Sequence, residues 1–208
     1  MRYRKKRLPD ASSAGHYIMK SDLTNEQLMQ AVSRDDRHAF AELVERLTDQ
    51  VYGLAFRLLG NEQDARDAAQ DTLVNIWQSR HRWSKRGAVS TWAYRITTNQ
   101  CLNRLRSRKR WRLLSIGARL DDSGDTIDVP LPSENLPDID IEKSEATQRL
   151  KIAIGKLPPR ERAAILLRHD QGLSGKEVAA VLNTTVYGVD SLLFRARKRL
   201  RALLFEKK

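Results

Sequence analysis

The chain has 208 residues and a formal net charge of +12 at neutral pH, with an isoelectric point near 10.1. This length predicts one or two small domains, and the excess of positive charge predicts a polyanionic partner. No window approaches the roughly 18 consecutive apolar residues of a membrane span, and the basic N-terminus lacks the apolar stretch of a signal peptide. We therefore expect a cytoplasmic protein without membrane insertion.

Helical signals dominate the first half of the chain. Residues 1–20 are basic without apolar periodicity, which predicts a disordered tail. After possible caps at Ser21, Asp22 and Thr24, apolar residues recur at helical spacing until Gly60 and Asn61 end the pattern. The residues of this stripe are Phe40, Leu43, Val44, Leu47, Val51, Leu54 and Leu58. Further helices are predicted over 64–77 and from about Val89 to about Arg110.

The stretch 113–145 separates two basic blocks. It contains the acidic, proline-bearing segment "LDDSGDTIDVPLPSENLPDIDIEKSE", whose composition supports neither a helix nor a core. We predict an extended acidic linker between a domain at 21–112 and a domain at 146–208. The predicted fold is all-α, with two small helical domains.

The second domain contains the spacing of a helix-turn-helix. A helix over 160–169 precedes a second helix capped by Ser174, with Glu177 three residues on, and a third over 186–204. The predicted shared core is Val178, Leu182, Val189, Leu193 and Ala196. The polar face of the last helix carries residues suited to base edges and phosphates in a major groove: Thr185, Tyr187, Ser191, Arg195 and Arg199. The alternative is a plain helical hairpin with a solvated basic face.

A second basic block runs from Arg82 to Arg112 without any acid, with Trp83, Trp92, Tyr94 and Trp111 interleaved among the cations. Aromatic rings amid arginines are suited to single-stranded nucleic acid, because unstacked bases lie on the rings while cations hold the backbone. Taken singly, Trp92 and Tyr94 are better interpreted as core residues. The amides of Asn99 and Asn103, one helical turn apart, could serve a flipped base.

These blocks together resemble a known family. The stretches "DARDAAQDTLVNIW", "RGAVSTWAYRITTNQCLNRLRSRKR", "LPPRERAAILLRHDQGLSGKEVAAVL" and "VDSLLFRARKRL" occur in this order around the acidic linker. The chain from about Asp22 to about Leu204 thereby resembles the extracytoplasmic-function sigma factors, the compact two-domain sigma factors of bacterial RNA polymerase. The resemblance implies an alternative sigma factor that binds core polymerase, recognises the −10 and −35 promoter elements and is held by an anti-sigma factor.

The resemblance also implies site residues in the N-terminal domain, sigma-2. A set that docks on the coiled coil of the polymerase β′ subunit, called here the predicted polymerase set, falls on Asp64, Asp67, Gln70, Asp71, Leu73 and Trp77. A set that melts and reads the −10 element, the predicted −10 set, falls on Trp83, Thr91, Trp92, Arg95, Asn99, Asn103 and Arg104.

In the C-terminal domain, sigma-4, the resemblance implies a predicted −35 set. Its members are Lys176, Thr184, Thr185, Ser191, Phe194, Arg195, Lys198 and Arg199. Arg197, Lys198 and Arg199 are expected on phosphates or on the flap of the polymerase β subunit, and the linker in the RNA exit path. The chain departs from the family at Asp190 and Leu192, where many members have basic residues, and at Trp83, where phenylalanine is common.

No catalytic chemistry is indicated by these residues. The chain has no phosphate-cradling glycine loop and no nucleophile with a paired base, and Cys101 is the sole cysteine. We expect no enzyme activity, no metal and no cofactor, and Cys101 is interpreted as a packed residue. Two alternatives remain: a stand-alone helix-turn-helix regulator, which should dimerise and bind a palindromic duplex, and an enzyme acting on nucleic acid.

Overall fold

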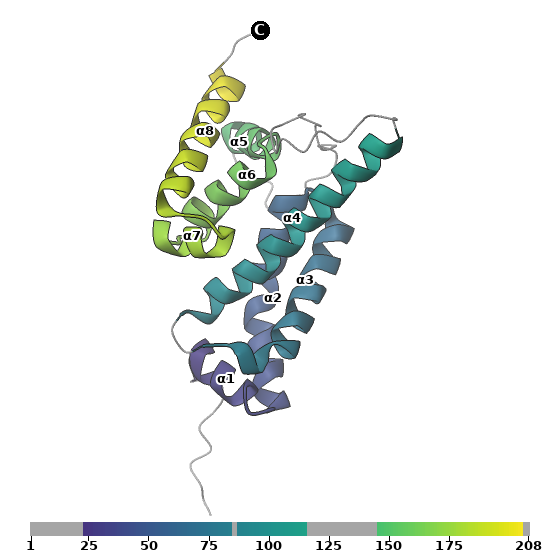
Figure 1. Cartoon of the computed structure of the whole chain (residues 1–208), viewed down its shortest axis with the longest axis vertical. Helices are drawn as coiled ribbons and strands as arrows, with labels where there is room; N and C mark the ends of the chain where they lie inside the picture. The colour runs from purple at the N-terminus through teal and green to yellow at the C-terminus, as the bar shows by residue number, and fades with distance from the viewer. Residues whose placement is uncertain (1–22, 85–86, 116–144, 206–208) are drawn as a thin grey trace, which may run out of the picture.

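The computed structural model describes residues 23–84, 87–115 and 145–205, and within 112–115 it describes the backbone only. Every regular element in these ranges is helical, which confirms the predicted all-α fold. The helices before residue 116 and those after residue 144 form two groups that lie side by side (Figure 1). The predicted tail at 1–20 lies outside the described residues, and so do residues 116–144 of the predicted linker.

The first two helices begin at side-chain caps, of which Thr24 was among the predicted ones and Asp36 was not. Helix α1 spans Asn25–Val32 and begins with a capping box, in which Thr24 and Gln27 exchange side-chain and backbone hydrogen bonds. Helix α2 spans Arg37–Leu59, and the Asp36 side chain accepts hydrogen bonds from the first backbone amides. Within the apolar stripe of α2, Phe40 and Val44 are half-buried. The other members of the stripe are buried: Leu43, Leu47, Val51, Leu54 and Leu58.

Two long helices complete the first group. Gly60 ends α2 with φ of 67°, a left-handed conformation that favours glycine. Asn61 then caps α3, which spans Glu62–Gln78 and is followed by the short 3-10 helix η2, Arg80–Arg82. Helix α4 spans Val89–Ser115. It is longer than the predicted helix, and it continues past the predicted start of the linker at residue 113.

The second group contains the helix-turn-helix. Helix α5 spans Glu145–Gly155. Helix α6 spans Pro159–Ile165 and continues through a π-helical segment at Leu166–Asp170. Its start at Pro159 is compatible with the fixed φ of proline, which suits the first turn of a helix. Helix α7, Gly175–Leu182, and helix α8, Val186–Phe205, follow.

The turn and the core of the helix-turn-helix agree with the sequence. Ser174 and Glu177 form the predicted capping box at the start of α7. Asn183, with φ of 48°, ends α7 in a left-handed conformation. All members of the predicted shared core are buried: Val178, Leu182, Val189, Leu193 and Ala196.

The two groups pack directly against each other. Helix α4 contacts α6 and α7, and α2 contacts α6, so that Leu54, Leu102 and Leu167 belong to one hydrophobic cluster. At the centre of this interface Arg162 of α6 is only 3% exposed, and its Nη1 donates to the carbonyl of Leu58 at 2.7 Å. Burial lowers the pKa of Arg162 to about 10, so the guanidinium stays protonated at neutral pH.

An ion pair and a buried thiol also lie within this packed region. Arg57 of α2 and Asp170, at the end of the π-helical segment, form an ion pair of 2.7 Å between the groups. Cys101 is fully buried in α4, and burial raises the pKa of its thiol to about 12. This supports its interpretation as a packed residue. Over the described ranges, no helix combines the length and the apolar character that crossing a membrane requires.

Candidate nucleic-acid interfaces

Helix α4 presents one exposed polar stripe. Arg95, Asn99 and Asn103 follow each other at intervals of four residues and are all exposed, so they share one face of the helix. Arg106 and Arg110 continue this face toward the C-terminal end of α4. The structure thus brings together three members of the predicted −10 set, and two neighbouring amides are flanked by guanidinium donors along a path that a nucleic-acid strand could follow.

The aromatic residues of the same block have different environments. Trp83 and Trp92 are half-buried and pack against the core formed by α1, α2 and α3. Tyr94 is 6% exposed, and its hydroxyl donates to Gln50 Oε1 at 3.1 Å. The core interpretation is therefore confirmed for Tyr94, whereas Trp92 is buried only in part. Trp111, at the far end of α4, is 73% exposed, which the sequence pattern did not distinguish from the others.

Thr91, also in the predicted −10 set, lies one turn before Arg95 on the same face of α4, but α7 packs against this part of the helix and Thr91 is half-buried. Its Oγ1 is buried beside the Glu177 carboxylate of α7. The pKa of Glu177 is lowered, chiefly by hydrogen bonds from Ser174 and to a smaller extent by Thr91. In this arrangement Thr91 contributes to the contact between the two helical groups and not to the surface that carries Asn99.

The predicted polymerase set divides between two faces of α3. Its three acids face α4, where Asp71 pairs with Arg104 and Asp64 pairs with Arg108. Asp67 lies 4.0 Å from Arg104. Residues expected on a protein partner and a residue expected on DNA therefore neutralise each other. Because these groups are partly exposed, each pair should stabilise the fold by about 1 kcal/mol or less.

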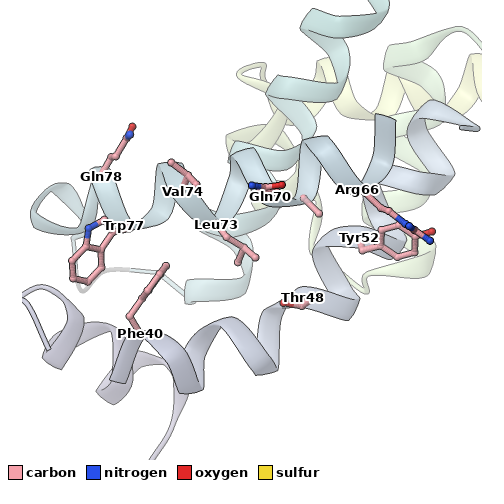
Figure 2. Close-up of a pocket in the computed structure, with 10 residues that line it drawn as sticks. Phe40, Thr48, Tyr52, Arg66, Gln70, Leu73, Val74, Trp77 and Gln78 are labelled. Atoms are coloured by element: carbon pink, nitrogen blue, oxygen red, sulfur yellow. The ribbon is translucent and has the colours of Figure 1, made fainter. Parts of the chain in front are cut away.

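The other members of the predicted polymerase set line an apolar groove between α2 and α3, with a volume of about 440 Å³. Figure 2 shows Phe40 and Trp77 at one end of this groove and Tyr52 and Arg66 at the other. The Phe40 and Trp77 rings lie 5.0 Å apart, and the Arg80 guanidinium lies 4.2 Å above the Trp77 ring. The groove residues are Phe40, Thr48, Tyr52, Arg66, Ala69, Gln70, Leu73, Val74, Trp77 and Gln78.

The α2 side of this groove was not predicted as a site. Phe40 was assigned to a core stripe, and Thr48 and Tyr52 were assigned no role. The groove identifies a surface on which apolar side chains of a protein partner could be buried.

The start of α8 displays exposed aromatic rings. Tyr187 is 82% exposed and Phe194 is 70% exposed, and a spacing of seven positions places both on one face of the helix. Ser191 lies between them and is half-buried. Leu192 is 7% exposed, so the position at which many family members have a basic residue belongs to the core of this chain.

The remaining members of the predicted −35 set lie around the same helix. Thr185 caps α8, since its Oγ1 accepts a hydrogen bond from the Gly188 amide at 3.0 Å. Thr184 is half-buried, and Lys176 is exposed in the first turn of α7. The members of the set that are cations of α8, Arg195, Lys198 and Arg199, are exposed. This basic surface could contact a duplex, and the described residues contain no cluster of side chains that could hold a metal ion.

Comparisons with known proteins agree with this geometry. Residues 43–111 match the family Sigma-70 region 2, and residues 147–200 match the family Sigma-70, region 4. The chain is 36% identical over 163 residues to the ECF RNA polymerase sigma factor SigE of Mycolicibacterium smegmatis, covering 78% of this chain and 60% of that protein. It is 30% identical to the ECF RNA polymerase sigma factor SigW of Bacillus subtilis, covering 83% of this chain and 92% of SigW.

A solved structure shares the fold. The sigma factor RpoE of Bartonella quintana, in complex with the anti-sigma factor NepR, superposes with a TM-score of 0.61 at 24% identity. The superposition covers 81% of this chain and 98% of that protein. The likeness thus extends over both helical groups.

Proposed function

The chain belongs to the extracytoplasmic-function sigma factors of RNA polymerase, and we propose that it reads the −10 element with α4 and the −35 element with α8. One observation carries this assignment. Residues 43–111, which match region 2, contain the exposed basic face of α4, and residues 147–200, which match region 4, contain the exposed basic face of α8. As an alternative sigma factor, the protein confers promoter recognition on core RNA polymerase.

The −10 element would be read as a separated strand. Unstacking a base costs a few kcal/mol, which the protein has to offset with contacts made only to the open strand. Asn99 and Asn103 are exposed and could bond the edge of a flipped base, while Arg95 and Arg106 hold its phosphates. The half-buried ring of Trp83 could bound this base on one side.

The −35 element would be read as a duplex. Helix α8 is the second helix of the helix-turn-helix and carries Ser191, Phe194 and Arg195 near its middle. Insertion of this helix in a major groove places such side chains on base edges, and Lys176, Lys198 and Arg199 would contact phosphates.

The remaining surfaces are proposed to bind subunits of RNA polymerase and an anti-sigma factor. The apolar groove between α2 and α3 is suited to the coiled coil of the polymerase β′ subunit, because a helix can place apolar side chains between Phe40, Leu73 and Trp77. Arg197 and its neighbours on α8 could contact the β flap. An anti-sigma factor that covered the same groove would keep the chain from polymerase. The acidic linker, which lies outside the described residues, is proposed to thread the RNA exit path.

The proposed mechanism is binding and not catalysis. Duplex recognition by one domain positions the other domain, whose contacts stabilise the open strand. We accordingly propose that the protein is not an enzyme and that it acts in the cytoplasm, where its polymerase and promoters are found.

Reconstituted transcription tests the proposal. Purified protein is added to core RNA polymerase and a genomic promoter library, and wild type is compared with Asn99→Ala and with the control Asn75→Ala, an exposed amide on α3. We expect promoter-specific transcripts that require the protein, weaken about tenfold or more in Asn99→Ala and persist in the control. No stimulated transcript, together with tight binding of the free protein to a palindromic duplex, would instead establish the stand-alone regulator.

A further inference from the structure

Glu161 of α6 is a buried carboxylate for which no role was predicted. It is 5% exposed, and it faces the DNA-reading helix α8. Its Oε1 accepts a hydrogen bond from Arg195 Nε at 3.4 Å, and its Oε2 lies 3.1 Å from Arg199 Nε. A buried carboxylate is stable only when cations or donors surround it. These two arginines supply them from adjacent turns of α8.

The way in which the two arginines are held leaves their terminal groups available. Both approach Glu161 through Nε, and their side chains remain 53% and 44% exposed. A guanidinium has five N–H donors, and its two terminal nitrogens can form the fork that binds guanine O6 and N7 or a phosphate. Glu161 therefore holds Arg195 and Arg199 at their Nε atoms, and the terminal nitrogens of both guanidinium groups remain exposed to a ligand.

We propose that Glu161 is a positioning residue for −35 recognition, which orients Arg195 and Arg199 through their Nε atoms before DNA binds. The inference rests on the proposed function of α8. An arginine that is already oriented loses less rotamer freedom on binding than a free one. Because only the correct sequence presents base acceptors where the oriented fork of Arg195 points, Glu161 contributes more to specificity than to general affinity for DNA.

The test uses holoenzyme formed from core polymerase and the full chain. A promoter obtained from wild-type transcription is compared with the same fragment in which the −35 block is scrambled, and the ratio of the two affinities is measured. We expect Glu161→Gln to lower this ratio about tenfold, as for the loss of one bidentate base contact. In the Arg195→Ala/Arg199→Ala background, the same change should lower the ratio by less than a factor of two, because no arginine remains to be positioned.

A matched control separates positioning from charge and from stability. Glu145→Gln also removes a carboxylate from an arginine, Arg149, but on the exposed surface of α5. It should leave the ratio unchanged. If Glu161→Gln lowers the melting temperature while the ratio stays at the wild-type value, Glu161 is only structural and the inference is overturned. Equal effects of Glu161→Gln in the two backgrounds would also overturn it. If wild type itself selects no promoter, the proposed function fails with it.

Discussion

The arginines of α4 and the arginines of α8 are held by acids in different environments. Arg104 and Arg108 pair with Asp71 and Asp64, whose side chains are 54% and 20% exposed. The arginines of α8 share Glu161, whose side chain is 7% exposed. An exposed pair is worth little and exchanges partners readily, whereas a buried carboxylate cannot lose its cations without a large cost.

This difference suits the two proposed tasks. A melted strand has to be captured after polymerase has bound, so α4 benefits from cations that can leave an acid for a phosphate. A duplex sequence has to be recognised in a fixed geometry, so α8 benefits from cations that are already oriented.

The largest effect should come from Arg162, the buried cation next to Glu161 in sequence. Its partners are backbone carbonyls, including that of Leu58 in the other helical group. Arg162→Met should lower the free energy of unfolding by about 3 kcal/mol, because buried carbonyls lose their donor. Chemical denaturation measures this, with the exposed Arg149→Met as control. A stability equal to wild type would show that this interface does not depend on the buried charge.

The next effect should come from the cations of α8. Arg195→Ala/Arg199→Ala leaves Glu161 buried without a cation and should cost about 2 kcal/mol of stability. Adding Glu161→Gln should restore most of that loss. Arg197→Ala/Lys198→Ala removes the same charge from the same helix without contacting Glu161, and should cost less than about 0.5 kcal/mol. If both double variants lose the same stability, Glu161 does not depend on its arginines.

A smaller effect is expected from the acids of α3. Asp64→Asn/Asp71→Asn should change stability by less than about 1 kcal/mol. The affinity of the free protein for a 20-nucleotide mixed-sequence strand should rise. Its dependence on salt should steepen by about two counterions, because two arginines are released for phosphates. The control Glu62→Gln/Glu145→Gln has the same change in net charge, and an equal steepening there would contradict release of specific arginines.

The effect that is smallest at neutral pH concerns Cys101, on the buried side of α4. Burial raises the pKa of its thiol from 9.0 to about 12, so iodoacetamide should not label the native protein at pH 8 and should label it rapidly in denaturant. The unfolded chain loses this proton at lower pH than the folded chain. Stability should therefore fall as the pH rises from about 9 to about 12. Rapid labelling of native protein would show that α4 opens away from its core.

Local features were predictable from the sequence. The capping box at Ser174, a possible cap at Thr24 and the end of a helix at Gly60 were recognisable because each depends on residues within a few positions. The predicted core of the helix-turn-helix was recognisable for the same reason. These features indicated the starts of α1 and α7 and an all-α fold.

Contacts between distant residues were not predictable. Arg162 reaches the carbonyl of Leu58 across 104 positions, and Arg108 reaches Asp64 across 44. A single sequence shows that such residues are charged but not which partners they meet. The burial of Trp92 and the exposure of Trp111 likewise depend on which side of α4 the other helices cover. The helices that carry the candidate surfaces were therefore predicted from the sequence, while the division of their residues between faces came from the structure.

One measurement tests the division of promoter reading between α4 and α8 most directly. Transcripts from the reconstituted polymerase are mapped on a library in which every upstream position is varied. Two sequence blocks should govern wild-type transcription. Asn99→Ala should weaken dependence on the −10 block alone, and Arg195→Ala should weaken dependence on the −35 block alone. If both variants weaken the same block, or neither changes any block, the assignment of the two helices is wrong.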